Sequence, residues 1–123
     1  MAQEREAIVT CDPERDGVVV RVRGDIDAES APLLQAALHT ARRARSARTV
    51  VDLSATEFAD SSILHVLLEE KEAHRRAARP MVVAGPFHES IERLFEVTGT
   101  TGYFALTDDI ATAMEAPRAV TDR

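Results

Sequence analysis

The sequence predicts an α/β domain with a mixed, mostly parallel β-sheet, an opening β-hairpin and about four covering helices. Apolar runs rich in β-branched residues alternate with stretches whose apolar residues recur at helical spacing. The first two runs flank a Pro/Asp/Gly-rich turn at residues 12–17, as in a hairpin. The 123 residues, 45% of them hydrophobic, suffice for one domain with its own core. We therefore expect a single domain over residues 1–123, with its core at about 7–116 and frayed ends at 1–6 and 117–123.

The first half of the chain is expected to form the hairpin and one helix. A strand at residues 7–11 pairs with a strand at 18–23, in which valines alternate with arginines. A helix at about 29–44 follows, because leucines and alanines recur there at helical spacing. Ser30 is a suitable N-cap for this helix, and Pro32 lies in its first turn, where a missing N–H costs nothing.

In the second half of the chain, strands and helices alternate, which implies parallel strands joined by helices. The expected elements are a buried strand at 49–53, a loop at 54–60, a helix from Ser61 or Ser62 to about 77, a strand at 80–85, a helix at 88–97, a strand at 103–106 and a helix at 108–116.

Charge and hydropathy exclude several classes of protein. The net charge of −6 argues against nucleic-acid binding, which usually needs a basic face. No apolar run reaches the roughly 18–20 residues that span a bilayer, and the first ten residues are too polar for a signal peptide. A single cysteine is compatible with a reducing compartment. We expect a cytoplasmic protein with no membrane span.

The sequence offers no catalytic or metal-binding constellation. Cys11 lies in an apolar strand pattern, which indicates packing rather than reactivity. The four histidines are scattered without metal-ligand spacing, and most are expected to be exposed on helices: His39, His65, His74 and His88. No phosphate-binding, dinucleotide-binding or nucleophile-elbow motif is present. We therefore predict no enzyme activity, no metal and no cofactor.

One segment, residues 50–64, stands out from this background. A buried strand leads through a short loop to Asp60, Ser61 and Ser62 at the start of a helix. Helix capping alone explains these residue types. However, the start of a helix after a parallel strand is also where α/β domains display functional groups. The two interpretations are compatible, because a serine in a capping region can also be modified.

The pattern V-V-D-L-S-x-x-x-F-A-D-S-S-x-L in this segment resembles the signature of the STAS domain, specifically of anti-sigma factor antagonists. Three further segments resemble the family in order and spacing, namely residues 18–31, 81–85 and 88–104. Together the similar segments cover about residues 7–116, nearly the whole chain.

The resemblance implies a small cytoplasmic switch without catalytic residues. Such proteins bind an anti-sigma factor that is also a serine kinase, and thereby free a sigma factor for transcription. The kinase phosphorylates the first serine of the motif, which corresponds to Ser61 here, and a serine phosphatase reverses the modification. Asp25, Asp60 and Ser62 are expected to flank the modified serine. The resemblance is compatible with a monomer or a weak dimer.

Residues after the two serines depart from the family pattern, which commonly has glycine at the positions of Ile63 and His65. We expect at least two of Ile63, Leu64 and Val66 to pack on the sheet. The one left exposed near the helix start, with Ile63 favoured, would contact a partner. Leu64 and Glu57 are further candidate contacts.

Three rival functions remain open. The first is a STAS docking module in another signalling complex or a lipid-transport complex, without phosphorylation. The second is a small-ligand or nucleotide binder, which is less favoured because the loop at 54–60 has no glycine to bring backbone amides close to a phosphate. An enzyme is the least supported.

Overall fold

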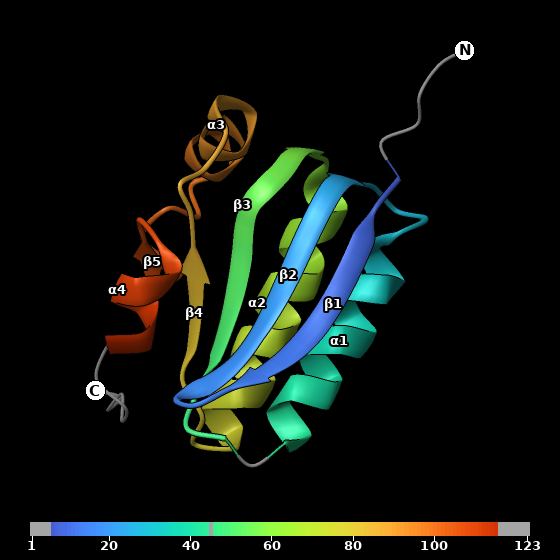
Figure 1. Ribbon diagram of the computed structural model, residues 1–123. Helices are drawn as coiled ribbons and strands as arrows, with labels where there is room; N and C mark the ends of the chain where they lie inside the picture. Colours follow the sequence, from blue (N-terminus) through green and yellow to red (C-terminus); the bar gives the residue numbers. More distant parts are fainter. Residues whose placement is uncertain (1–5, 45, 116–123) are drawn as a thin grey trace.

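The structure is a computed structural model that describes residues 6–44 and 46–115 (Figure 1). Its elements are β1 (Ile8–Glu14), β2 (Gly17–Ile26), α1 (Ala31–Arg43), β3 (Thr49–Ala59), α2 (Ser61–Arg76), β4 (Met81–Ala84), α3 (Glu89–Val97), β5 (Leu106–Thr107) and α4 (Ile110–Glu115). The predicted α/β order with an opening hairpin is confirmed. The ends expected to fray lie outside the described residues, apart from Glu6.

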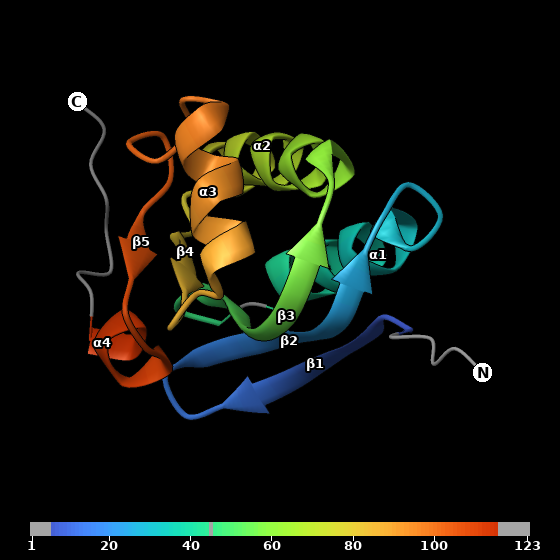
Figure 2. The ribbon, with the colours of Figure 1, turned by 90° about the horizontal axis from the view of Figure 1, so that it is seen from above.

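The strands form one five-stranded sheet in the order β1-β2-β3-β4-β5. β1 and β2 are antiparallel, and the other neighbours are parallel. Helices α1 and α2 cover one face of the sheet, α4 packs on the other, and α3 lies beyond the ends of β3 and β4 (Figures 1 and 2). The predicted mixed, mostly parallel sheet is therefore confirmed.

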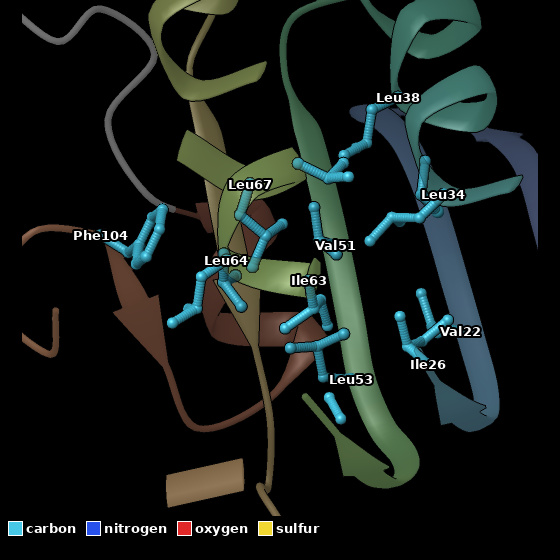
Figure 3. Packing of buried hydrophobic residues seen from close by; sticks show 14 of the residues in the cluster. Val22, Ile26, Leu34, Leu38, Val51, Leu53, Ile63, Leu64, Leu67 and Phe104 are labelled. Carbon is cyan, nitrogen blue, oxygen red and sulfur yellow. The ribbon is translucent and has the colours of Figure 1, made fainter. Parts of the chain in front are cut away.

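The larger core lies between the sheet and the helices α1, α2 and α3. Leu34 of α1 and Leu67 of α2 are fully buried and point toward Val22 and Val51 of the sheet (Figure 3). Burying one such leucine contributes roughly 1.5–3 kcal/mol. A smaller core on the opposite face joins α4, through Ala113, to the sheet. These contacts hold the strand ends in place, and the strand ends position the candidate site.

Strand β3 continues to Ala59, so the predicted loop over residues 54–60 is wrong. The neighbouring strand β2 also continues, to Ile26, and stays paired with β3 across two register shifts that place Asp25 beside Phe58. Such shifts interrupt the two-residue alternation of buried and exposed side chains. As a consequence, the apolar pattern no longer indicates a strand beyond residue 53, although the backbone pairing of β3 with β2 continues.

Two edge strands also differ from the prediction. β1 runs through Pro13 to Glu14, because an edge strand tolerates a residue that cannot donate to a neighbour. β5 comprises only Leu106–Thr107 instead of residues 103–106. Phe104 instead packs in the main core, where its side chain is visible near Leu64 in Figure 3.

Three of the four histidines are exposed as expected, whereas His74 of α2 is only 1% exposed. Its Nδ1 lies 2.8 Å from the carbonyl oxygen of Glu70, and its Nε2 lies 2.9 Å from Oγ1 of Thr49. A carbonyl only accepts hydrogen bonds, so Nδ1 carries the proton and Nε2 of the neutral ring accepts from Thr49. The histidine is thus a hydrogen-bonded core residue.

Candidate functional site

The ends of β2 and β3 meet the start of α2 at one edge of the sheet. The backbone N–H of Asp60 donates to the carbonyl oxygen of Ile26 over 3.1 Å. This bond brings the end of β2 beside the first turn of α2, although the two segments lie far apart in the sequence. Asp25 and Glu57 near the strand ends, and Ser61 and Ser62 in that turn, therefore share one edge.

Asp60 is the N-cap of α2, and its Oδ1 accepts a hydrogen bond from the backbone N–H of Ser62 over 2.8 Å. Its backbone is extended, as is typical of an N-cap. Ser61 is exposed, whereas Ser62 is half-buried. Capping thus falls to the aspartate, and the Ser61 side chain is accessible for chemistry.

Asp25 brings a partly desolvated carboxylate to this edge. The residue is half-buried, and its Oδ1 is buried without a hydrogen-bond partner among the residues that the structure describes. A buried acceptor without a donor is unfavourable. This oxygen therefore costs stability at the strand end beside Ser61.

An acidic groove of about 480 Å³ extends from Asp25 along the start of α1. We use this name for the hollow lined by Glu6, Ala7, Asp25, Asp27, Glu29, Ser30 and Leu33. Leu33 is 51% exposed, so the groove combines carboxylates with an apolar side chain.

Asp27 and Ser30 organise the loop beside this groove. The Oδ1 of Asp27 accepts from the backbone N–H and the hydroxyl of Ser30, both at 3.0 Å. These hydrogen bonds lower the pKa of Asp27. Ser30 occupies the predicted N-cap position of α1, but its side chain does not cap the helix and accepts instead from the N–H of Asp27.

The end of β3 presents two exposed side chains, Glu57 and Phe58, and Phe58 lies beside Asp25 in the sheet register. The hydroxyl of Ser90 donates to the carbonyl oxygen of Glu57 over 2.6 Å and ties α3 to this strand end. Phe58 is 51% exposed. Phe58 was not predicted from the sequence to be a surface residue. A break in the alternating pattern around residues 55–59 was the available signal.

Three apolar residues of the first turns of α2 are all buried. Ile63 is 1% exposed, and Leu64 and Val66 are each 6% exposed. The expectation that one of them, Ile63, stays exposed is wrong, because α2 packs against both the sheet and α1, and its start is covered as well. Ile63 and Leu64 are core residues, as Figure 3 shows, and are not available as surface contacts.

His65 and Cys11 each make a contact within the fold. His65 is exposed, and its Nε2 lies 3.8 Å from Oε2 of Glu69. Cys11 is partly buried against α1, and burial raises the pKa of its thiol. Among residues 6–44 and 46–115, no group of three or more His, Cys, Asp or Glu could hold a metal ion. No helix in the described ranges has the length and apolarity that crossing a membrane demands.

This edge and the fold define a small α/β domain that presents a capped helix start and an acidic surface to solvent. A family model described as "Mlab, STAS domain" matches residues 9–108. The chain therefore belongs to the STAS domain family, as its sequence resemblance implies. A search of curated proteins finds no match.

Solved structures agree with this assignment. The chain is similar to an anti-sigma factor antagonist from Mycobacterium paratuberculosis, with 25% identity, a TM-score of 0.80 and coverage of 94% of this chain and 97% of that one. It also shares its fold with the anti-sigma factor antagonist SpoIIAA in its unphosphorylated form, at 15% identity and a TM-score of 0.67, covering 92% and 100% of the two chains.

The Bacillus cell fate determinant SpoIIAA in the phosphorylated form has the same fold. It is 18% identical to this chain, with a TM-score of 0.67, and the match covers 88% of this chain and 97% of that one.

Proposed function

We propose that this protein is an anti-sigma factor antagonist that is switched by phosphorylation of Ser61. It binds an anti-sigma factor with serine kinase activity in the bacterial cytoplasm and frees a sigma factor for transcription. Phosphorylation ends the binding, and a serine phosphatase restores it. The protein works as a monomer or weak dimer by binding, without catalysis and without contact to nucleic acid.

The main support for this proposal is that Ser61, the first residue of α2, is exposed. Its hydroxyl is not used for helix capping, because Asp60 caps the helix. The chain belongs to the STAS family and is similar to an anti-sigma factor antagonist. The resemblance of its Asp-Ser-Ser motif to the family signature implies that Ser61 corresponds to the phosphoacceptor. A relative of the same fold exists in a phosphorylated form.

Phosphorylation of Ser61 is compatible with the fold. The phosphoryl group adds about −1.5 to −2 charges at neutral pH. The first backbone N–H groups of α2 and the helix dipole favour an anion at that position. Asp25 and Asp60 oppose it to some extent. The modified protein therefore stays folded, and the effect falls on the surface that a partner covers.

The added charge is large enough to act as a switch. A partner carboxylate about 6 Å from the phosphoryl group is repelled by roughly 4–5.5 kcal/mol before screening, at an effective dielectric constant near 20. This repulsion corresponds to about a hundredfold or greater loss of affinity. No conformational change is needed.

The partner surface in this proposal includes Phe58 and Asp25. Phe58 offers an exposed aromatic ring of the kind that dominates binding energy at interfaces. Asp25 is half-buried and lies beside Phe58 in the sheet register, so it adds a carboxylate to this surface. Glu57 lies beside Phe58 and contributes at the rim of this surface.

Intact-mass analysis after incubation with ATP and candidate anti-sigma kinases from the same genome tests the proposal. We expect a gain of one phosphoryl group that is lost in Ser61→Ala and retained in the matched variant Ser62→Ala. Retention of the modification in Ser61→Ala would contradict the assignment of the acceptor. Stable binding to a partner without modification by any candidate kinase would favour the rival docking module.

A further inference from the structure

A second cleft, of about 260 Å³, opens between α3 and the segment around β5, and none of its lining residues belongs to the site around Ser61. Its apolar part consists of Phe87, Phe95 and Leu106. Phe95 is 2% exposed, and the rings of Phe87 and Phe95 meet edge to face at 5.9 Å. Figure 2 shows α3 and β5 on the two sides of this region. The cleft therefore has a fixed aromatic floor.

Carboxylates surround this aromatic floor. Glu92 and Glu96 are exposed and lie one turn apart on α3, and Asp108 lies on the opposite wall. Within the part of the chain that the structure describes, no cation lies within ion-pairing distance of these three. Arg93 on the same helix pairs with Glu89 instead, at 3.8 Å. Like charges one turn apart repel each other, so a cation between them is favoured.

Among charged side-chain groups, the guanidinium group of arginine is the most complementary to an aromatic floor with a carboxylate rim. A guanidinium group stacks its flat face on an aromatic ring and donates paired hydrogen bonds to carboxylates. An ammonium group lacks the flat face. The volume of about 260 Å³ is below the roughly 300–1,000 Å³ of typical small-molecule sites. It suits a single side chain that a larger molecule presents.

We propose that this cleft receives an arginine side chain of a protein partner. The Glu92 and Glu96 carboxylates hold the guanidinium group, and Phe87 supplies the stacking surface. This binding is separate from the chemistry of Ser61 and stands or falls independently of it.

The test uses the full chain, labelled with ¹⁵N, and a short capped peptide with one central arginine. We expect amide shifts centred on Phe87, Leu106 and Thr107 at millimolar peptide concentrations. The matched peptide with citrulline, which has nearly the same shape and no charge, is expected to cause none. The double variant Glu92→Gln/Glu96→Gln should weaken binding about tenfold, whereas Glu89→Gln, on the same helix but outside the cleft, should not.

Four results would overturn the proposal. The first is the absence of shifts with the arginine peptide at millimolar concentration, and the second is equal shifts with citrulline. The third is undiminished binding by the double variant, after circular dichroism has confirmed its fold. The fourth is binding that emerges only after Arg118 and Arg123 are replaced by glutamine, because the chain's own C-terminal segment would then be the occupant.

Discussion

The Oδ1 of Asp60 accepts a hydrogen bond from the backbone N–H of Ser62 across 2.8 Å, and Ser61 stands between these two residues with its side chain exposed. The bond satisfies one of the backbone donors at the start of α2 that have no partner inside the helix. Because the aspartate does the capping, the Ser61 hydroxyl can be modified without loss of the cap. Asp60 thus stabilises the helix, and the adjacent Ser61 is left for regulation.

Removal of this cap tests that division. Asp60→Ala should lower the free energy of unfolding by about 1 kcal/mol, within the 0.5–2 kcal/mol range of lost N-caps. Urea denaturation followed by circular dichroism measures the change. Asp60→Asn, which keeps a side-chain oxygen acceptor, should lose much less. Ser61→Ala should be close to neutral, and a loss as large as that of Asp60→Ala would show that the serine is part of the cap.

Phe58 and Ile63 form a contrasting pair of apolar residues near the site. Phe58→Ala removes an exposed ring, so stability should change by less than about 0.5 kcal/mol while partner affinity falls roughly tenfold. Ile63→Ala removes a buried side chain and should cost about 2–5 kcal/mol of stability. Urea denaturation and calorimetric titration of the partner separate the two effects. Unchanged partner affinity of Phe58→Ala would remove this ring from the interface.

We expect the carboxylate of Asp25 to lower the stability of the fold and to strengthen partner binding. Asp25→Ala eliminates the buried, unpaired Oδ1 and should raise the free energy of unfolding by about 0.5–1 kcal/mol, while it weakens partner binding. Glu29→Ala, an exposed carboxylate of the same acidic groove, is the control and should leave stability nearly unchanged. A clear loss of stability in Asp25→Ala would mean that the oxygen has a favourable role within the fold.

His74 should make stability depend on pH. Burial lowers the pKa of this histidine below its ordinary value of 6.5, despite the nearby Glu70, and Arg42 and Arg79 act in the same direction as burial. The unfolded chain therefore binds a proton more readily, so this contribution to stability is complete above that value and declines as pH falls below it. We expect a loss of about 1 kcal/mol between about pH 7.5 and 5.5.

Urea denaturation across this pH range measures the effect of His74. His74→Gln should be less stable at the upper end and should show a flatter dependence on pH. His65→Gln, at an exposed position on the same helix, should keep the dependence of the unaltered protein. An equally steep dependence in His74→Gln would assign the titration to another group.

The order of elements and the start of α2 were predictable from the sequence, because apolar runs such as residues 49–53 and 81–84 mark buried strands directly. The full length of β3 was not, because two register shifts against β2 break the alternation while the backbone pairing continues. Phe58 lies in that stretch, and its exposure depends on the strand reaching Ala59. Its place on the surface was therefore not predictable either.

The burial of Ile63 and Leu64 at the start of α2 could be recognised only from the tertiary structure. The sequence places Ile63 and Leu64 on α2, but a helix with apolar residues on adjacent faces can bury either face. In the structure α2 packs against α1 and the sheet, and both residues join the main core. His74 illustrates the same point, because the hydroxyl of Thr49 that satisfies it belongs to a distant strand.

Calorimetric titration of the partner kinase with unmodified protein and with protein phosphorylated at Ser61 tests the central claim most directly. We predict that the phosphorylated protein remains folded and binds about a hundredfold more weakly, and that Ser61→Asp, with less charge, lies between the two. Equal affinities of the modified and unmodified proteins would contradict the claim that charge at Ser61 is the switch.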